Sequence, residues 1–583
     1  MYRTEYPRPN FARDNWLSLN GIWDFKFDEE EWQTINVPFV YQSELSGLNT
    51  NKPCDIVWYR RKFNVPIEWK GNLIKINFGA IDYKCKVYIN GQMLGEHIGG
   101  NTNFSFDTRE YLNWIEEEIV VYVEDPWEDE TIPRGKQYWL EEPDSIWYTR
   151  TTGIWQSVWL EPVNVINLEY VKFTPDIDKG LVDIEFEVSK LAENLSAILK
   201  ISFDGQIVSD DVLNIHEIYN KRGIDIFNKK IFRTFNHNMG WCWTPESPNL
   251  FDVVITLISD NKILDKVETY FGMRKIHTES GMVYLNNRPY YQKLILDQGY
   301  WPEGLLTAPS DESFKLDINL SKQMGFNGCR KHQKVEDPRF LYWADKLGFL
   351  VWGEMANCAQ YSFKSVERII KEWIDVIKRD YNHPCIVAWV PLNESWGIPY
   401  VGRNIEQQHH SLTMYHLTYS LDNTRIVISN DGWELTKTDI CAVHNYNHGN
   451  RNEEEVYNYY VQSLEDKDSI LSSQPAGRKI YAEGFKNEGE PIMLTEFGGI
   501  AYDKTNLKGW GYSVATTEEE FLKDYERIIE AVYNSKAIYG FCYTQLSDVE
   551  QEVNGLLTYD RKPKCKLEEI KKINSKFRNN IVY

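Results

Sequence analysis

The second half of the chain carries a repeating pattern that restricts the fold more than any other feature. From about residue 275 onward, apolar runs of five to seven residues alternate with amphipathic stretches of ten or more. Two of these stretches, residues 365–380 and 518–533, place their large apolar side chains on one helical face. The apolar runs lie at residues 291–296, 325–330, 349–354, 386–391, 425–429, 440–444, 491–496 and 537–543.

Eight buried strands that alternate with helices predict a (β/α)8 TIM barrel over residues 275–583. A doubly wound open sheet is the alternative for such a pattern. That fold binds nucleotides through a Gly-rich loop after its first strand. No Gly-rich phosphate loop follows the first run here, so we favour the barrel.

The first half of the chain has a different sequence pattern. Residues 16–162 contain short runs, such as 21–27, 58–63 and 86–91, that alternate apolar and polar residues between Gly, Asn, Asp and Pro. This pattern predicts an N-terminal jelly-roll β-sandwich over residues 1–162. Residues 163–274 again read as strands, and their length fits a seven-strand immunoglobulin-like β-sandwich.

The bulk composition excludes several kinds of partner. With 64 basic and 86 acidic residues, the net charge of −22 should repel nucleic acid and anionic membranes. No apolar run is long enough for a membrane span, and the first residues show no signal peptide. The nine cysteines form no close CxxC pair. We therefore expect a cytoplasmic protein with reduced thiols.

Polar residues at the carboxyl ends of the predicted strands are the candidates for chemistry, because TIM-barrel active sites form there. Glu394 follows the fourth strand and Glu496 ends the seventh. Around the same mouth the sequence places Arg330, His332, Glu354, Asn393, His444, Tyr446 and Gln545.

Two carboxylates facing each other across the mouth suit a retaining glycosidase. Glu496 would attack the anomeric carbon as nucleophile, and Glu394 would protonate the leaving oxygen and later activate water. Their carboxyl groups should then lie about 5–5.5 Å apart, against about 6.5–9.5 Å in an inverting enzyme. A Glu at a strand end can instead cap a helix or pair with Arg, but two in one polar ring favour catalysis.

The residues around both carboxylates resemble glycoside hydrolase family 2, the β-galactosidase/β-glucuronidase/β-mannosidase family. Residues 390–397, Val-Pro-Leu-Asn-Glu-Ser-Trp-Gly, resemble its acid/base signature. Residues 495–499, Thr-Glu-Phe-Gly-Gly, resemble its nucleophile signature. Further similarity at residues 16–23, 153–160 and 325–332 extends the resemblance over essentially the whole chain.

The resemblance implies roles for the other candidates. Asn393 should bind the sugar hydroxyl at C2, Tyr446 should orient Glu496, and Arg330 should hold Glu496 ionised. Glu354 aligns with a magnesium ligand of some β-galactosidases, but no second ligand is visible, so we expect no metal. Glycoside hydrolysis by two carboxylates needs no organic cofactor, and we expect none. The remaining candidate sugar contacts are His332, His444, Asp297, Trp301, Gln545 and Tyr543, the last of which stands where family members often have Trp.

The resemblance also bears on the sugar. Related β-glucuronidases clamp the sugar carboxylate with Asn-x-Lys, whereas the matching residues here are Glu552-Val553-Asn554. An acidic residue there should repel a carboxylate. We therefore expect an exo-acting enzyme for a neutral non-reducing-end sugar, with β-galactoside favoured. β-Glucoside, α-L-arabinopyranoside, β-mannoside and β-glucuronide stay open.

Other classes of protein remain as alternatives. A non-catalytic carbohydrate-binding protein on an inactive barrel would normally have lost a catalytic carboxylate, and both are present. A transglycosylase shares the covalent intermediate and differs only in the group that attacks it. The expected partner is a small glycoside or oligosaccharide. Because many family members form dimers or tetramers, a homo-oligomer stays open.

Overall fold

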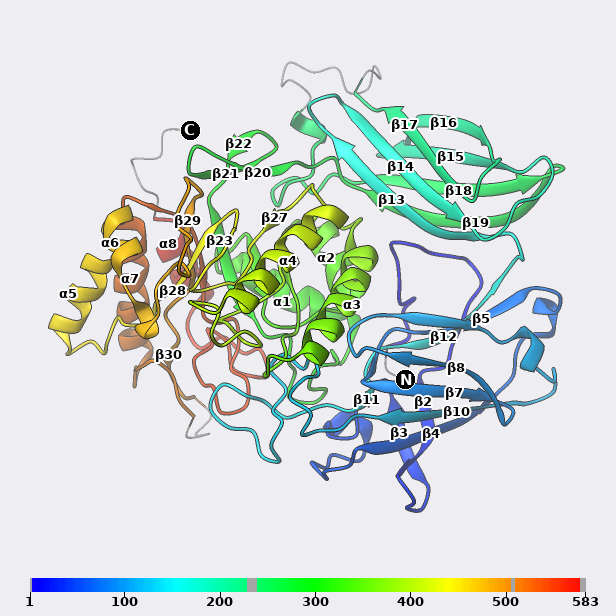
Figure 1. The fold of residues 1–583 in the computed structure, drawn as a ribbon, viewed down its shortest axis with the longest axis horizontal. Coiled ribbons are helices and arrows are strands. Elements are labelled where there is room, and N and C mark those ends of the chain that lie inside the picture. The colour runs from blue at the N-terminus through cyan, green and yellow to red at the C-terminus, as the bar shows by residue number, and fades with distance from the viewer. Residues whose placement is uncertain (1–2, 228–238, 505–508, 577–583) are drawn as a thin grey trace.

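A computed structural model of the chain describes residues 3–227, 239–504 and 509–576. Two β-sandwiches and one barrel are visible as separate bodies (Figure 1). The blue sandwich holds the N-terminal strands, the cyan-to-green sandwich follows, and the remaining chain forms the barrel. Each body has its own cluster of buried apolar side chains. None of the described helices is long and apolar enough to cross a membrane.

The predicted barrel strands are all present. They pair in parallel in the order β27-β26-β25-β24-β23-β32-β29-β28. Their bounds are β23 (Gln292–Asp297), β24 (Gly328–Lys331), β25 (Leu350–Glu354), β26 (Ile386–Val390), β27 (Ile426–Val427), β28 (Cys441–His444), β29 (Ile492–Glu496) and β32 (Ile538–Tyr543). The (β/α)8 prediction is therefore confirmed, and the doubly wound alternative is wrong.

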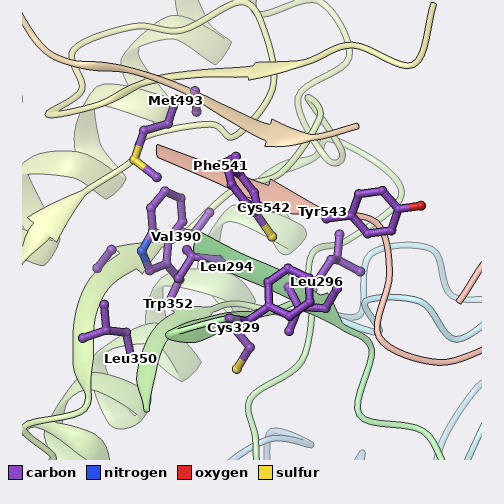
Figure 2. Close-up of a cluster of buried hydrophobic side chains, with 14 of the residues drawn as sticks. Leu294, Leu296, Cys329, Leu350, Trp352, Val390, Met493, Phe541, Cys542 and Tyr543 are labelled. Carbon is purple, nitrogen blue, oxygen red and sulfur yellow. The ribbon is translucent and has the colours of Figure 1, made fainter. Parts of the chain in front are cut away.

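Helices surround these strands, and most of the longer ones bury an apolar face. The predicted helices over residues 365–380 and 518–533 are α3 and α7. The main helices are α1 (Asp311–Gln323), α2 (Pro338–Leu347), α3 (Phe363–Asp380), α4 (Ile405–Leu421), α5 (Glu454–Ser463), α6 (Lys467–Ser472), α7 (Glu518–Asn534) and α8 (Leu567–Asn574). Inside the ring, Leu294, Trp352 and Met493 from different strands pack together (Figure 2).

The N-terminal sandwich consists mainly of a four-stranded sheet, β1-β12-β5-β9, and a six-stranded sheet, β3-β2-β4-β10-β7-β8. Alternation along β10, with burial on every second residue, matches a strand that faces the core on one side. The strands are β1 (Leu17–Ser18), β2 (Gly21–Phe27), β3 (Gln33–Val37), β4 (Ile56–Phe63), β5 (Leu73–Phe78), β7 (Lys84–Ile89), β8 (Gln92–Ile98), β9 (Phe104–Asp107), β10 (Glu117–Glu124) and β12 (Val158–Val163).

The second sandwich has the immunoglobulin-like arrangement that was predicted. A three-stranded sheet, β13-β14-β17, faces a four-stranded sheet, β16-β15-β18-β19. The strands are β13 (Leu168–Asp176), β14 (Leu181–Val188), β15 (Ser196–Phe203), β16 (Gln206–Asn214), β17 (Tyr219–Asp225), β18 (Phe251–Ser259) and β19 (Lys262–Phe271).

Between β10 and β12, the segment 125–152 leaves the N-terminal sandwich and reaches the mouth of the barrel. Gly135 donates its backbone N–H to Asn357 O at 3.0 Å, and Trp147 packs edge-on against Trp396 with ring centroids 4.6 Å apart. Gly135 has φ +60°, and a Cβ there would lie 2.1 Å from Gln333 O, so only glycine fits this approach. The segment therefore forms one wall of the barrel mouth.

Candidate active site

Glu394 stands on a tight turn just after β26. Glu394 and Ser395 both have positive φ, at 49° and 60°, a conformation that non-glycine residues seldom adopt. Hydrogen bonds from Glu394 N to Asp431 O, at 2.8 Å, and from Trp396 N to Asn393 O, at 2.9 Å, hold the turn. Backbone strain of this kind is common at functional sites, where the surrounding structure maintains it.

Glu496, the last residue of β29, lies opposite and is 5% exposed. Its two carboxylate oxygens have separate donors. Arg330 Nη1, from β24, lies 2.8 Å from Oε1, and the Tyr446 hydroxyl, beyond β28, donates to Oε2 at 2.7 Å. The structure thus brings both predicted neighbours to this carboxylate.

The environment of Glu496 favours its charged form. Burial by itself would raise the pKa of Glu496, but the positive charges of His444 and Arg330 lower it well below the usual range. Arg330 is fully buried and also pairs with Glu354 and Asp431 through Nε, at 2.7 and 3.0 Å. Glu496 is therefore an anion at neutral pH.

His444 connects the two candidate carboxylates. Its Nδ1 lies 2.8 Å from Glu394 Oε1 and 3.5 Å from Glu496 Oε2, and its Nε2 lies 3.2 Å from Asp431 Oδ1. Burial disfavours the imidazolium, but Glu496, Asp431 and Glu394 outweigh it and raise the pKa of His444 to about 10. Ligand atoms of Glu394, His444 and Glu496 all lie within 4.8 Å of one another, so the carboxylates approach closely.

Asn393 and His332 complete this ring. Arg330 Nη2 donates to Asn393 Oδ1 at 2.6 Å, and Asn393 Nδ2 lies 3.2 Å from His332 Nε2. His332 Nε2 is also 3.4 Å from Glu496 Oε1. Burial lowers the pKa of His332 to about 3, so this imidazole is neutral.

Four predicted sugar contacts lie beside this ring rather than in it: Asp297 O accepts from the backbone N–H of His332 at 3.0 Å, and Gln298 links Gln545 to His332. Gln545 hydrogen-bonds Gln298 and Asn554, at 2.9 and 2.6 Å. Asp297 pairs with Lys331 at 2.6 Å, and Trp301 packs against the Phe314 ring. Tyr543 packs edge-on against Phe497 and Tyr525, with its hydroxyl directed away from the other labelled side chains in Figure 2. The geometry therefore gives these four contacts no direct support.

Sequence reasoning missed Asp431 and Lys136. Asp431 follows β27 and accepts a 2.5 Å hydrogen bond from the Thr495 hydroxyl, so the rule of reading every strand end could have found it. Lys136 comes from the segment 125–152, and no local pattern there pointed to the barrel.

The ammonium of Lys136 is buried next to two aromatic rings. Lys136 is 5% exposed, and its Nζ lies 5.5 and 5.4 Å from the ring centroids of Trp147 and Tyr148. Burial lowers the pKa of Lys136, and the charges of Glu552, Glu394 and Glu496 partly offset this effect. Among the described residues, no carboxylate oxygen lies within 4.0 Å of the Lys136 ammonium, the distance that defines an ion pair.

Two side-chain groups in the described chain have metal-compatible spacing. One is the trio Glu394, His444 and Glu496, and the other is Asp345, His383 and Cys385. In the second, Asp345 Oδ2 already contacts His383 Nδ1 at 2.6 Å and accepts from the Tyr270 hydroxyl at 2.8 Å. Glu354 is engaged as well, by Arg330 Nε and by the backbone N–H of Gln333.

Known proteins resemble the chain along its whole length. Residues 16–162 match the glycosyl hydrolases family 2 sugar binding domain, residues 166–274 match a further glycosyl hydrolases family 2 model, and residues 308–579 match the family 2 TIM barrel domain.

Curated relatives carry two different activities in their names. A β-galactosidase of Thermoanaerobacter pseudethanolicus is 29% identical over 66% of this chain and 52% of its own length, so the chain matches about half of that relative. A β-glucuronidase of Streptococcus agalactiae is 22% identical over 96% of both chains.

Solved structures agree on the fold. The β-glucuronidase of Bifidobacterium dentium, complexed with coumarin-3-O-glucuronide, superposes with a TM-score of 0.77 at 18% identity, covering 98% of this chain and 99% of its own. That identity shows the fold alone. The three family models account for both sandwiches and the barrel, and the chain belongs to glycoside hydrolase family 2.

Proposed function

We propose that this family 2 glycoside hydrolase is a retaining, exo-acting β-glycosidase that removes a neutral non-reducing-end sugar, with β-galactoside favoured. The observation that carries the mechanism is that one oxygen of Glu394 and one of Glu496 lie within 4.8 Å of each other, a nearest-atom distance that fits the carboxyl separation of a retaining enzyme. Retaining enzymes hold their carboxyl groups about 5–5.5 Å apart, whereas inverting enzymes leave room for water at about 6.5–9.5 Å.

The proposed mechanism assigns a residue to each catalytic step. Glu496, kept anionic by Arg330 and His444, attacks the anomeric carbon while Glu394 protonates the departing oxygen. A covalent glycosyl-enzyme forms, and Glu394 then removes a proton from the water that releases the sugar. Asn393, fixed by Arg330, is positioned to bind the C2 hydroxyl, a contact that strengthens in the transition state.

The preference for a neutral sugar is inferred from the negative charge of Glu552, in the loop after β32. Glu552 is 4% exposed and accepts a hydrogen bond from the Tyr148 hydroxyl. When ionised, it opposes a sugar carboxylate at the position where related glucuronidases have their clamp. β-Galactoside is favoured among neutral sugars because β-galactosidases are frequent among the relatives.

A β-glucuronide is the second candidate, and Lys136 is the observation that favours it. A buried ammonium without an ion-pair partner among the described residues gains a charge-assisted hydrogen bond if the substrate supplies a carboxylate. The burial that raises the pKa of Glu552 also weakens the repulsion expected from that residue.

A screen of p-nitrophenyl β-glycosides tests the proposal. The panel contains β-galactoside, β-glucoside, β-mannoside, β-glucuronide and α-L-arabinopyranoside. Strong turnover of one neutral glycoside supports the favoured sugar, and strong glucuronide turnover supports the second candidate. Absence of turnover on every substrate would contradict the proposed glycosidase activity and favour a non-catalytic carbohydrate-binding protein. Product analysis with an added acceptor sugar separates hydrolysis from transglycosylation.

A further inference from the structure

The carboxylate of Glu552 has one bound and one free oxygen. Its Oε2 accepts a hydrogen bond from the Tyr148 hydroxyl and lies 3.5 Å from Gln545 Nε2. Among the described residues, no donor and no cation bonds to Oε1. Glu552 is 4% exposed, yet Oε1 is not one of the fully buried polar atoms that lack a partner, so it keeps contact with solvent. A free carboxylate oxygen in such a place favours a ligand that brings a hydrogen-bond donor.

Contacts from two bodies of the chain hold this carboxylate in place. Tyr148 belongs to the segment 125–152 and is fully buried, so its hydroxyl fixes Oε2 from the side of the N-terminal sandwich. On the barrel side, the backbones of Val549 and Glu552 form a closed turn with reciprocal N–H to O hydrogen bonds of 3.0 and 2.9 Å. Because the backbone and one oxygen are fixed, the second oxygen is presented in a defined direction.

A line of side-chain contacts connects Glu552 with the proposed nucleophile. Gln545, which approaches Glu552, accepts a hydrogen bond from Gln298 Nε2 at 2.9 Å. Gln298 Oε1 lies 3.0 Å from His332 Nδ1, and His332 Nε2 lies 3.4 Å from Glu496 Oε1. Glu552 therefore belongs to the polar surface that surrounds the candidate active site.

Tyr512 is a side chain that Glu552 and both candidate catalytic carboxylates influence together. Its ring stacks on Tyr446 with centroids 3.6 Å apart and an interplanar angle of 9°. Burial raises the pKa of Tyr512, and the negative charges of Glu394, Glu552 and Glu496 raise it further. Because Coulomb energies fall with distance, the three carboxylates lie around the same part of the barrel mouth.

A sugar hydroxyl is the group that fits this oxygen best. Burial raises the pKa of Glu552, and the positive charge of Lys136 opposes that shift. In its ionised form the carboxylate only accepts hydrogen bonds, and in its protonated form it also donates one. A hydroxyl serves either form, because it donates and accepts, and it brings no charge to a site that already holds Glu394 and Glu496. A hydrogen bond to an ionised acceptor is roughly twice as strong as one between neutral groups.

We propose that Glu552 is a specificity-determining residue, which binds one hydroxyl of the non-reducing-end sugar through Oε1. This inference rests on the proposed function, because it needs a neutral sugar held between Glu394 and Glu496. Asn393 serves the C2 hydroxyl in that mechanism, so Glu552 binds the hydroxyl at C3, C4 or C6. Sugars that lack this hydroxyl, or carry it in the opposite configuration, are rejected, because the buried carboxylate then loses its donor.

The test compares kcat/KM for the neutral p-nitrophenyl β-glycoside that the enzyme turns over best with kcat/KM for its 3-, 4- and 6-deoxy analogues. In the wild type, the analogue without the bound hydroxyl should be slower by about 10–100-fold, the loss of one hydrogen bond to a charged acceptor. In Glu552→Ala, the disadvantage of that analogue alone should fall below threefold. The other two ratios should stay within twofold of wild type. A ratio within one preparation does not depend on how much of the protein is folded.

The matched control is Glu550→Ala, which removes a carboxylate of the same loop that accepts from the backbone N–H of Thr149 at 3.0 Å. It should retain all three wild-type ratios. If Glu552→Ala does not fold, Glu552→Gln keeps an acceptor for Tyr148 and should reduce the same disadvantage. Three ratios that are unchanged in the Glu552 variants would overturn the inference and leave the glycosidase activity intact. A wild-type enzyme that turns over no neutral glycoside would overturn the proposed function, and the inference with it.

Discussion

Glu496 and Glu394 have the same side chain but different surroundings. Glu496 receives Arg330 Nη1 and the Tyr446 hydroxyl, one on each carboxylate oxygen. Glu394 contacts His444 Nδ1 at 2.8 Å, and its side chain is 17% exposed against 6% for Glu496. The more accessible carboxyl group is the one to which the proposed mechanism assigns proton exchange with the leaving group and with water.

This difference predicts the effect of Glu394→Gln. The amide cannot protonate a departing oxygen, so glycosides with poor leaving groups should lose several orders of magnitude in kcat/KM. Activated 2,4-dinitrophenyl glycosides leave without that proton, and their first step should slow far less. The check is a plot of log kcat/KM against leaving-group pKa, which should be steeper for the variant. Equal losses for both classes of substrate would remove Glu394 from the acid role.

At the scale of single residues, the sequence was informative for several side chains at the ends of barrel strands. Glu394, Glu496, Arg330 and His444 were found in this way, and the structure places them together. Lys136 was out of reach, because its approach depends on how the segment 125–152 crosses between two bodies of the chain. Tyr543 shows the opposite difficulty, since alternation along a strand end does not tell which side chain faces the barrel axis.

Among the elements, the segment 125–152 has the most direct bearing on specificity. If Lys136 meets a sugar carboxylate, Lys136→Met should lower kcat/KM for a β-glucuronide by about 10–100-fold, the loss of one charge-assisted hydrogen bond. kcat/KM for a neutral β-galactoside should change less than threefold. Parallel kinetics on both substrates, with melting temperatures as a check on folding, make the comparison. Equal losses on both would assign Lys136 a structural role.

The N-terminal arm, residues 3–14, makes a different prediction about stability. Glu161 is fully buried and binds Arg8 and Arg13 of the arm at 2.8 and 3.2 Å. Burial by itself raises the pKa of Glu161, but both guanidinium groups outweigh it and lower the pKa to about 2. Glu161→Gln leaves buried Arg13 and partly exposed Arg8 short of one ionic partner, and at pH 7 it should lower the free energy of unfolding by about 3–5 kcal/mol.

The pH dependence of this effect has a definite sign. A carboxyl group with a depressed folded-state pKa stabilises the fold above its unfolded pKa of about 4.5 and loses that contribution as pH falls toward about 2. Denaturant titrations of the wild type and Glu161→Gln should therefore converge over that interval. Glu268→Gln, at a largely exposed pair with Lys266, is the control and should cost less than about 1 kcal/mol. A constant difference at every pH would contradict the ionic account.

At the scale of the whole molecule, the order of two sandwiches and a barrel could be predicted because each body has its own periodicity. Burial alternates along the sandwich strands, whereas β26 is buried along its whole length and is followed by a helix. The domain boundaries after residues 162 and 274 remain predictions. Contacts between bodies were not predictable, because the position of Lys136 arises from surfaces far apart in sequence.

If Glu496 is the nucleophile of a retaining glycosidase, azide should rescue the variant Glu496→Ala. Turnover of the best aryl glycoside should fall by several orders of magnitude. Sodium azide should restore part of it by entering the space of the missing carboxylate, and the product should be a glycosyl azide with inverted anomeric configuration. Near-normal turnover of Glu496→Ala without azide would show that Glu496 is not the nucleophile.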